Sequence, residues 1–78
     1  MVKFATDTVL VSLEKVMRVE KRQGEPYTYT RQGNKITEIS YSIYIRYATD
    51  KETTLSCGIN EQGKKNQDEW FAEILKIL

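Results

Sequence analysis

The chain has 78 residues, which suits one domain spanning residues 1–78. Twelve Lys and Arg residues nearly balance eleven Asp and Glu residues, so the formal net charge is only +1. A charge this small argues against wholesale attraction to nucleic acid or to a membrane surface. A hydrophobic content of 40% is ordinary for a folded protein and argues against disorder.

Cysteine content and the N-terminal region indicate where the protein works. The single cysteine, Cys57, excludes an intrachain disulfide, on which small secreted domains usually depend. The longest apolar run near the start, residues 9–11, is far shorter than a signal peptide's apolar region or the ~20 residues of a membrane span. We therefore expect a cytoplasmic protein without a membrane partner.

Residues 8–22 are the first segment with a structural pattern, and the pattern is ambiguous. Apolar residues alternate as in a strand, but three of them also fit helical spacing, namely Leu13, Val16 and Met17. We favour one or two strands with a kink near residues 14–15, where Val16 falls out of phase and a β-bulge would bend the chain. A partly helical segment is the alternative.

The middle of the chain predicts a strand meander. Residues 27–31 are β-prone and lie between turn signals at 23–26 and 32–35. Residues 35–48 then show strict alternation, with apolar or aromatic side chains on one face at Ile39, Tyr41, Ile43, Ile45 and Tyr47. After a polar turn at 49–52, residues 53–59 alternate again, with Leu55, Cys57 and Ile59 on one face. Two hairpins therefore share the long central strand, and the sheet covers about residues 8–59.

The C-terminal segment predicts an amphipathic helix over about residues 67–78. Asn66 is a suitable N-cap, and Glu69 completes a capping-box pattern. The apolar stripe consists of Trp70, Phe71, Ile74, Leu75, Ile77 and Leu78. An isolated helix of this length is marginal in water, so it must pack on one face of the sheet. The predicted fold is α+β: an antiparallel meander of four to five strands with one C-terminal helix on one face.

Catalytic and metal-binding chemistry finds little support in the sequence. The chain has no histidine, which removes the commonest general base and metal ligand, and its four glycines do not cluster into a phosphate-binding loop. The acidic pairs fit structural roles better, Asp50 and Glu52 in a turn and Asp68 and Glu69 at a helix start. Cys57 alternates with core residues and is interpreted as one of them. We expect no enzyme activity, cofactor or metal.

Binding is the function class that remains. A sheet with one helix leaves one face open, and the candidate binding residues on it are Tyr27, Tyr29, Arg31, Tyr44 and Arg46. The strand register decides whether the open face carries Tyr27, Tyr29 and Arg31 or instead Thr28 and Thr30. A candidate basic patch consists of Lys15, Arg18, Lys21, Arg22 and Lys35. Contact with a protein, either a partner or a second copy, is the favoured hypothesis because acidic residues dilute the patch. Single-stranded nucleic acid, stacked on the tyrosines, is the alternative.

Overall fold

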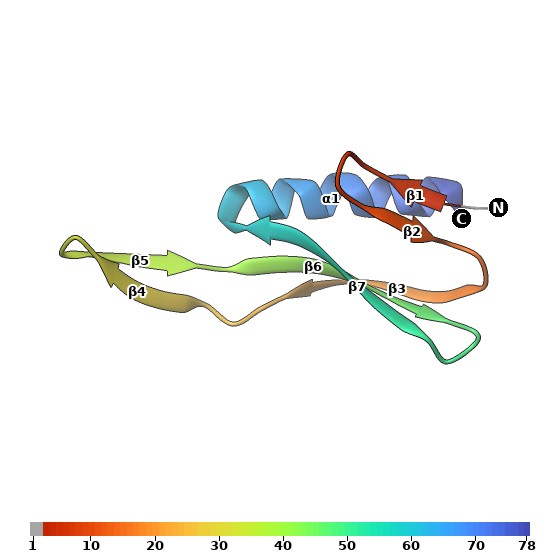
Figure 1. The fold of residues 1–78 in the computed structure, drawn as a ribbon, viewed down its shortest axis with the longest axis horizontal. Coiled ribbons are helices and arrows are strands. Elements are labelled where there is room, and N and C mark those ends of the chain that lie inside the picture. Colours follow the sequence, from red (N-terminus) through yellow and green to blue (C-terminus); the bar gives the residue numbers. More distant parts are fainter. Residues whose placement is uncertain (1–2) are drawn as a thin grey trace.

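The computed structural model describes residues 3–78 and contains seven strands followed by one helix (Figure 1). In chain order the elements are β1 (Lys3–Ala5), β2 (Leu10–Ser12), β3 (Val16–Gln23), β4 (Tyr27–Arg31), β5 (Asn34–Glu38), β6 (Ser40–Tyr47), β7 (Glu52–Ile59) and α1 (Asn60–Ile77). All strand pairs are antiparallel, and α1 packs on the sheet. The predicted α+β class is confirmed.

A long hairpin followed by β7 forms the meander. β3 pairs with β6, β4 pairs with β5, and β7 pairs with the other edge of β6. The turn predicted at residues 23–26 does not reverse the chain, because β3 continues into β4 on the same side of the hairpin. The reversal lies at Gln32 and Gly33, whose φ angles of 50° and 78° are both positive.

The N-terminal part is extended, which settles the ambiguity of residues 8–22. β1 and β2 form a two-stranded ribbon, and the chain kinks at Lys15, where φ is 59°. The pairing of β3 with β6 shifts register between Val16 and Arg18, which identifies a bulge at this point. The kink is therefore where the sequence predicted it. β1 lies before the predicted start of the sheet.

The helix begins at Asn60, about two turns before the predicted start. Asn66 is therefore not an N-cap: it lies inside α1, and its amide donates a hydrogen bond of 2.9 Å to the carbonyl of Cys57. Residues 60–66 are polar and include Gly63, so this part of the helix lacks the apolar stripe that would predict it. Gly63 is needed where it lies, because a Cβ there would collide with the backbone of Gly58 in β7.

The core lies between α1 and the sheet, with β1 and β2 at one end. Its buried members are Phe4, Val11, Leu13, Ile43, Ile45, Leu55, Cys57 and Ile74. The helix contributes less than its apolar stripe predicted: Trp70 and Phe71 are half-buried, whereas Leu75 and Leu78 are exposed. Gln67 is buried beside them, and its amide donates to the carbonyls of Arg22 and Ser42 at 2.8 and 2.7 Å.

β7 also departs from the predicted alternation. Its register with β6 shifts between Tyr41 and Ser42, which leaves Cys57 without a partner in β6. Gly58 follows with a φ of 117°. The bulge reverses the phase of the strand, so Ile59 is exposed instead of sharing the buried face of Leu55 and Cys57.

Candidate interaction surfaces

The ribbon formed by β4 and β5, residues 27–38, projects from the rest of the molecule, and we call it the arm (Figure 1). No residue of the arm belongs to the core cluster or packs against it. The molecule consequently measures 50 × 24 × 17 Å along its principal axes. Two-stranded ribbons are marginally stable on their own in water, so a long exposed one calls for a role other than stabilising the fold.

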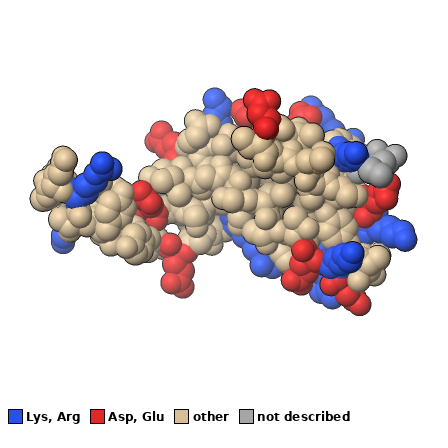
Figure 2. All heavy atoms as spheres, in the orientation of Figure 1, with Lys and Arg blue, Asp and Glu red and all other residues tan. Residues whose placement is uncertain are grey.

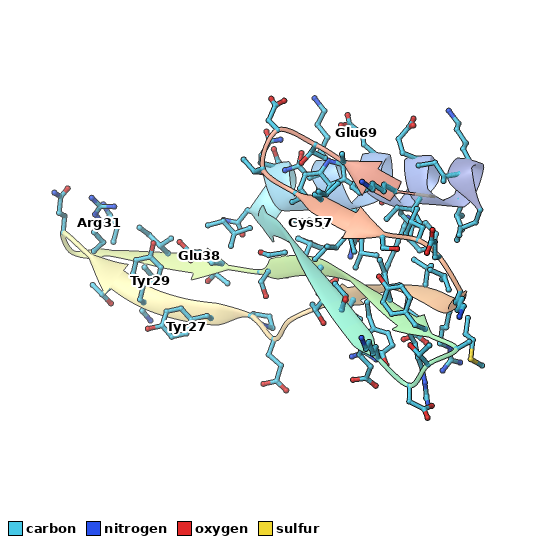
Figure 3. The ribbon with its side chains drawn as sticks, turned by 45° about the vertical axis from the view of Figure 1, so that its right-hand side comes forward. Tyr27, Tyr29, Arg31, Glu38, Cys57 and Glu69 are labelled. Atoms are coloured by element: carbon cyan, nitrogen blue, oxygen red, sulfur yellow. The ribbon has the colours of Figure 1, made fainter. Side chains whose placement is uncertain are left out.

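One side of the arm is aromatic, and we call it the aromatic face. Tyr27 and Tyr29 stack with ring centroids 5.8 Å apart, and the strand register places Ile36 opposite Tyr29. Tyr27 is 66% exposed, whereas Tyr29 and Ile36 are half-buried against each other. Figure 3 shows Tyr27 and Tyr29 on the arm, away from Cys57 in the body of the protein. The result is an aromatic surface that no other part of residues 3–78 covers.

The opposite side of the arm is polar, and we call it the threonine face. Strand alternation places Thr28, Thr30, Lys35 and Thr37 on it. The hydroxyl groups of Thr28 and Thr37 lie 3.0 Å apart and share a hydrogen bond across the ribbon. The two faces therefore differ sharply in character, and the aromatic face is the one suited to packing.

Basic and acidic residues lie at opposite ends of the arm. Arg31 and Lys35 lie near its tip, whereas Glu38 and the adjoining Glu25 lie where the arm joins the body. Figure 2 shows this separation of basic from acidic atoms on the side in view. Arg31 forms no ion pair within residues 3–78.

Glu38 connects the acidic end of the arm to its aromatic face. The hydroxyl of Tyr29 donates a hydrogen bond of 2.8 Å to the Oε1 atom of Glu38. This hydrogen bond is the main reason why the pKa of Tyr29 lies above its ordinary value, with burial and the negative charge of Glu38 adding to it. The pair fixes the Tyr29 ring across the ribbon.

The open side of the three-stranded sheet is less accessible than the sequence predicted. Tyr44 is only 8% exposed, because the guanidinium of Arg22 lies 3.8 Å from the centre of its ring. Its hydroxyl donates a hydrogen bond of 2.6 Å to Glu52, which raises the pKa of Tyr44. The prediction of an exposed Tyr44 is wrong, since the ring is covered by Arg22, which lies diagonally across β3 as the register partner of Ser42. Arg46, in contrast, is exposed as predicted.

The proposed binding residues therefore do not form one surface. Tyr27, Tyr29 and Arg31 share the aromatic face of the arm, whereas Tyr44 and Arg46 lie on β6 in the body. Sequence reasoning also omitted Ile36 and Glu38, which complete the aromatic face. The sequence shows that Asn34, Ile36 and Glu38 occupy alternate positions and so share a face. Only the register shows that Ile36 and Glu38 lie opposite the tyrosines.

The candidate basic patch is likewise dispersed and partly neutralised. Arg18 and Arg22 both pair with Glu20, at 3.1 and 3.3 Å. Lys21 pairs with Asp68 of the helix at 2.9 Å, Lys15 lies at the kink before β3, and Lys35 lies on the arm. Exposed ion pairs of this kind leave less net positive charge for an anionic ligand.

Other candidate groups occupy structural positions. Cys57 is buried, and burial raises the pKa of its thiol. Glu52 accepts the hydrogen bond of Tyr44, and Asp68 lies within the helix beside Lys21. Within residues 3–78, no three side chains of metal-binding type come together. In the same range, no helix is both long and apolar enough to cross a membrane.

Comparisons with known proteins identified no relative of this chain. The chain matches no protein-family model, no curated protein and no solved structure. Its function must therefore be inferred from its own surfaces.

Proposed function

We propose that this chain is a non-enzymatic protein-interaction module and that the aromatic face of the arm is its contact surface. The observation that carries the proposal is the exposed stack of Tyr27 on Tyr29 beside Ile36, on a ribbon that contributes nothing to the core. Tyrosine is enriched at the centres of protein interfaces, where it offers a large area and a polar tip. A partner would remove this surface from water.

Binding of single-stranded nucleic acid has less support. Bases stack on accessible aromatic rings while free cationic groups follow the phosphates. Here Tyr44 lies under Arg22, and Arg22 itself pairs with Glu20. On the arm, residues 27–38, Arg31 and Lys35 are opposed by Glu38, which leaves a net charge of only +1, and Glu25 lies just outside its base. These features favour a protein partner.

Site-specific photo-crosslinking in cells that produce the protein would test the proposal. A photoreactive phenylalanine derivative replaces Tyr27 on the aromatic face in one variant. In the matched control, the same derivative replaces Thr28, the next residue along the strand, which lies on the threonine face. We expect a defined protein adduct from position 27 and much less adduct from position 28, because only the aromatic face contacts the partner.

The adduct identifies the class of partner. Adducts of equal yield from both positions, or no protein adduct from position 27, would refute the assignment of the aromatic face. A nuclease-sensitive adduct from position 27 would favour the nucleic-acid alternative instead. An adduct with twice the mass of the chain would identify a second copy as the partner.

A further inference from the structure

The aromatic face has an ordered sequence of chemical groups from its base to its tip. Three cross-strand pairs follow one another: Tyr27 with Glu38, then Tyr29 with Ile36, then Arg31 with Asn34. The face is thus acidic at one end, aromatic and apolar in the middle, and basic at the other end. Such a pattern is complementary to itself when it is turned end for end.

We propose that a second copy of this chain occupies the aromatic face, with the two arms packed face to face and antiparallel about a two-fold axis. This inference rests on the proposed function, since it names the partner of the same surface. A two-fold contact uses one patch twice, so every favourable contact that it contains occurs twice. The observation that selects a second copy is the end-to-end complementarity of charge on the arm.

In this arrangement the axis passes between the two Tyr29–Ile36 pairs. Tyr27 and Arg31 lie four residues apart on one strand, a spacing of about 13 Å at ~3.3 Å per residue. Turning the arm about its middle therefore brings Arg31 of one copy over Tyr27 of the other. Glu38, the cross-strand neighbour of Tyr27, then lies within reach of the same guanidinium.

The charges at the two ends of the aromatic face favour the antiparallel orientation. Arg31 near the tip of one arm would face Glu38 near the base of the other, whereas Lys35 lies on the threonine face, outside the contact. Parallel arms would instead bring the two basic tips together and the two acidic bases together. The antiparallel arrangement therefore has the better electrostatic complementarity.

The contact would be small and the dimer weak. Each arm strand has only five residues, and stable dimers commonly bury ~800 Å² per partner, which is more than one face of such a ribbon offers. We therefore expect dimerisation that depends on protein concentration and weakens as added salt screens the charges. Sedimentation measurements over a wide range of concentrations suit this range of affinity.

The decisive experiment is a charge exchange between the two ends of the face. Arg31→Glu places like negative charges opposite each other in its own dimer, and Glu38→Lys does the same with positive charges. Each variant alone should self-associate about tenfold more weakly than the parent, because two pairs change from attraction to repulsion. An equimolar mixture of the two should regain parental affinity, because every pair in the mixed dimer joins opposite charges.

Two controls accompany the exchange. Lys64→Glu makes the same change of charge as Arg31→Glu, but on an exposed residue of α1, and should leave dimerisation unchanged. Glu38→Gln keeps an oxygen that can accept the hydrogen bond from Tyr29 while removing the charge. Glu38→Gln should weaken dimerisation even if Glu38→Lys distorts the arm. Adding Arg31→Gln to Glu38→Gln should weaken dimerisation little further, because the two residues act as a pair.

The outcomes separate this inference from the proposed function. If the parent is monomeric at every concentration, or if mixing restores nothing and Glu38→Gln has no effect, the second copy is not the occupant. A crosslinked adduct of a different protein at position 27 would then leave the proposed function standing. Equal weakening by Lys64→Glu would show a general effect of net charge and would also overturn the inference.

Discussion

At Gly63 the helix approaches the sheet so closely that backbone meets backbone. A Cβ atom at this position would collide with the carbonyl group of Gly58, and Gly58 itself adopts a φ of 117° that other residues rarely adopt. The pair sets the distance between α1 and β7. The two glycines therefore decide the geometry of helix docking, although each lies outside the hydrophobic core.

The substitution Gly63→Ala tests this close approach. In a helix without the contact, alanine would stabilise by about 1 kcal/mol relative to glycine. Here we expect the free energy of unfolding to fall by about 1–3 kcal/mol, because the helix must move away from β7. Urea titration measures the change, and Lys64→Ala, on the neighbouring exposed residue, should stay within about 0.5 kcal/mol of the parent. A more stable Gly63→Ala would show that the contact does not limit packing.

The hydrogen bond between Tyr29 and Glu38 gives the arm a dependence on alkaline pH. Folding raises the pKa of Tyr29 above 10.0, so the folded arm favours the neutral phenol. This contribution to stability is complete below pH 10 and is lost as the pH rises through the raised pKa.

Titration of the Tyr29 ring carbons by NMR, in the parent and in Glu38→Gln, checks the origin of this shift. Removing the carboxylate charge should lower the midpoint for Tyr29. Tyr44 provides an internal control. Its hydroxyl donates to Glu52, which is the same in both proteins, so the titration midpoint of Tyr44 should not change. Equal midpoints for Tyr29 in the two proteins would mean that Glu38 is not the cause.

Helix α1 is amphipathic, but it buries a narrower stripe than its sequence predicts. Ile74 is 0% exposed, whereas the adjacent Leu75 is 52% exposed. Ile74→Ala should therefore lower the free energy of unfolding by about 2–5 kcal/mol, and Leu75→Ala should change it by no more than about 0.5 kcal/mol. Thermal or urea unfolding compares the two variants. Similar losses would show that the helix docks through a different face.

Periodicity identified most of the elements and missed local backbone geometry. The central strand, the kink near residues 14–15 and the existence of a C-terminal helix were all predictable from alternation and spacing. The start of the helix was not, because Gly63 resembles a turn residue and its neighbours are polar. The exposure of Ile59 follows from a bulge, which moves the side chains beyond it to the other face without a clear signal in the sequence.

Only part of the candidate site could be predicted, because the sequence gives the residue types but not the register in which the strands pair. Residue type alone singled out Tyr27, Tyr29 and Arg31, which do share one face of the arm. The burial of Tyr44 depends on which residue of β3 lies beside it, and a sequence does not state that pairing. Once the register places Arg22 near Tyr44, the cation covers the ring.

On the scale of the whole molecule, the arm and the body should differ in stability. The arm contributes nothing to the core, so its backbone hydrogen bonds can open without unfolding β6 or the helix. We expect amides of residues 27–38 to exchange with solvent much faster than those of residues 43–45, which lie in the buried part of β6. Hydrogen exchange read by mass spectrometry or NMR measures this directly. Uniform protection would mean that the arm and the body unfold as one unit.

The reversal at Gln32 and Gly33 lies far from the core, and this position has a consequence for the rate of folding. Gln23 and Tyr41 pair in the body although 18 positions separate them along the chain. Closing that loop directly costs more chain entropy than closing the short turn and adding pairs one after another toward the body. Changes that weaken the turn should therefore slow folding of the sheet while leaving the unfolding rate of the body nearly unchanged. The arm would then guide the chain to its native register before it contacts any partner.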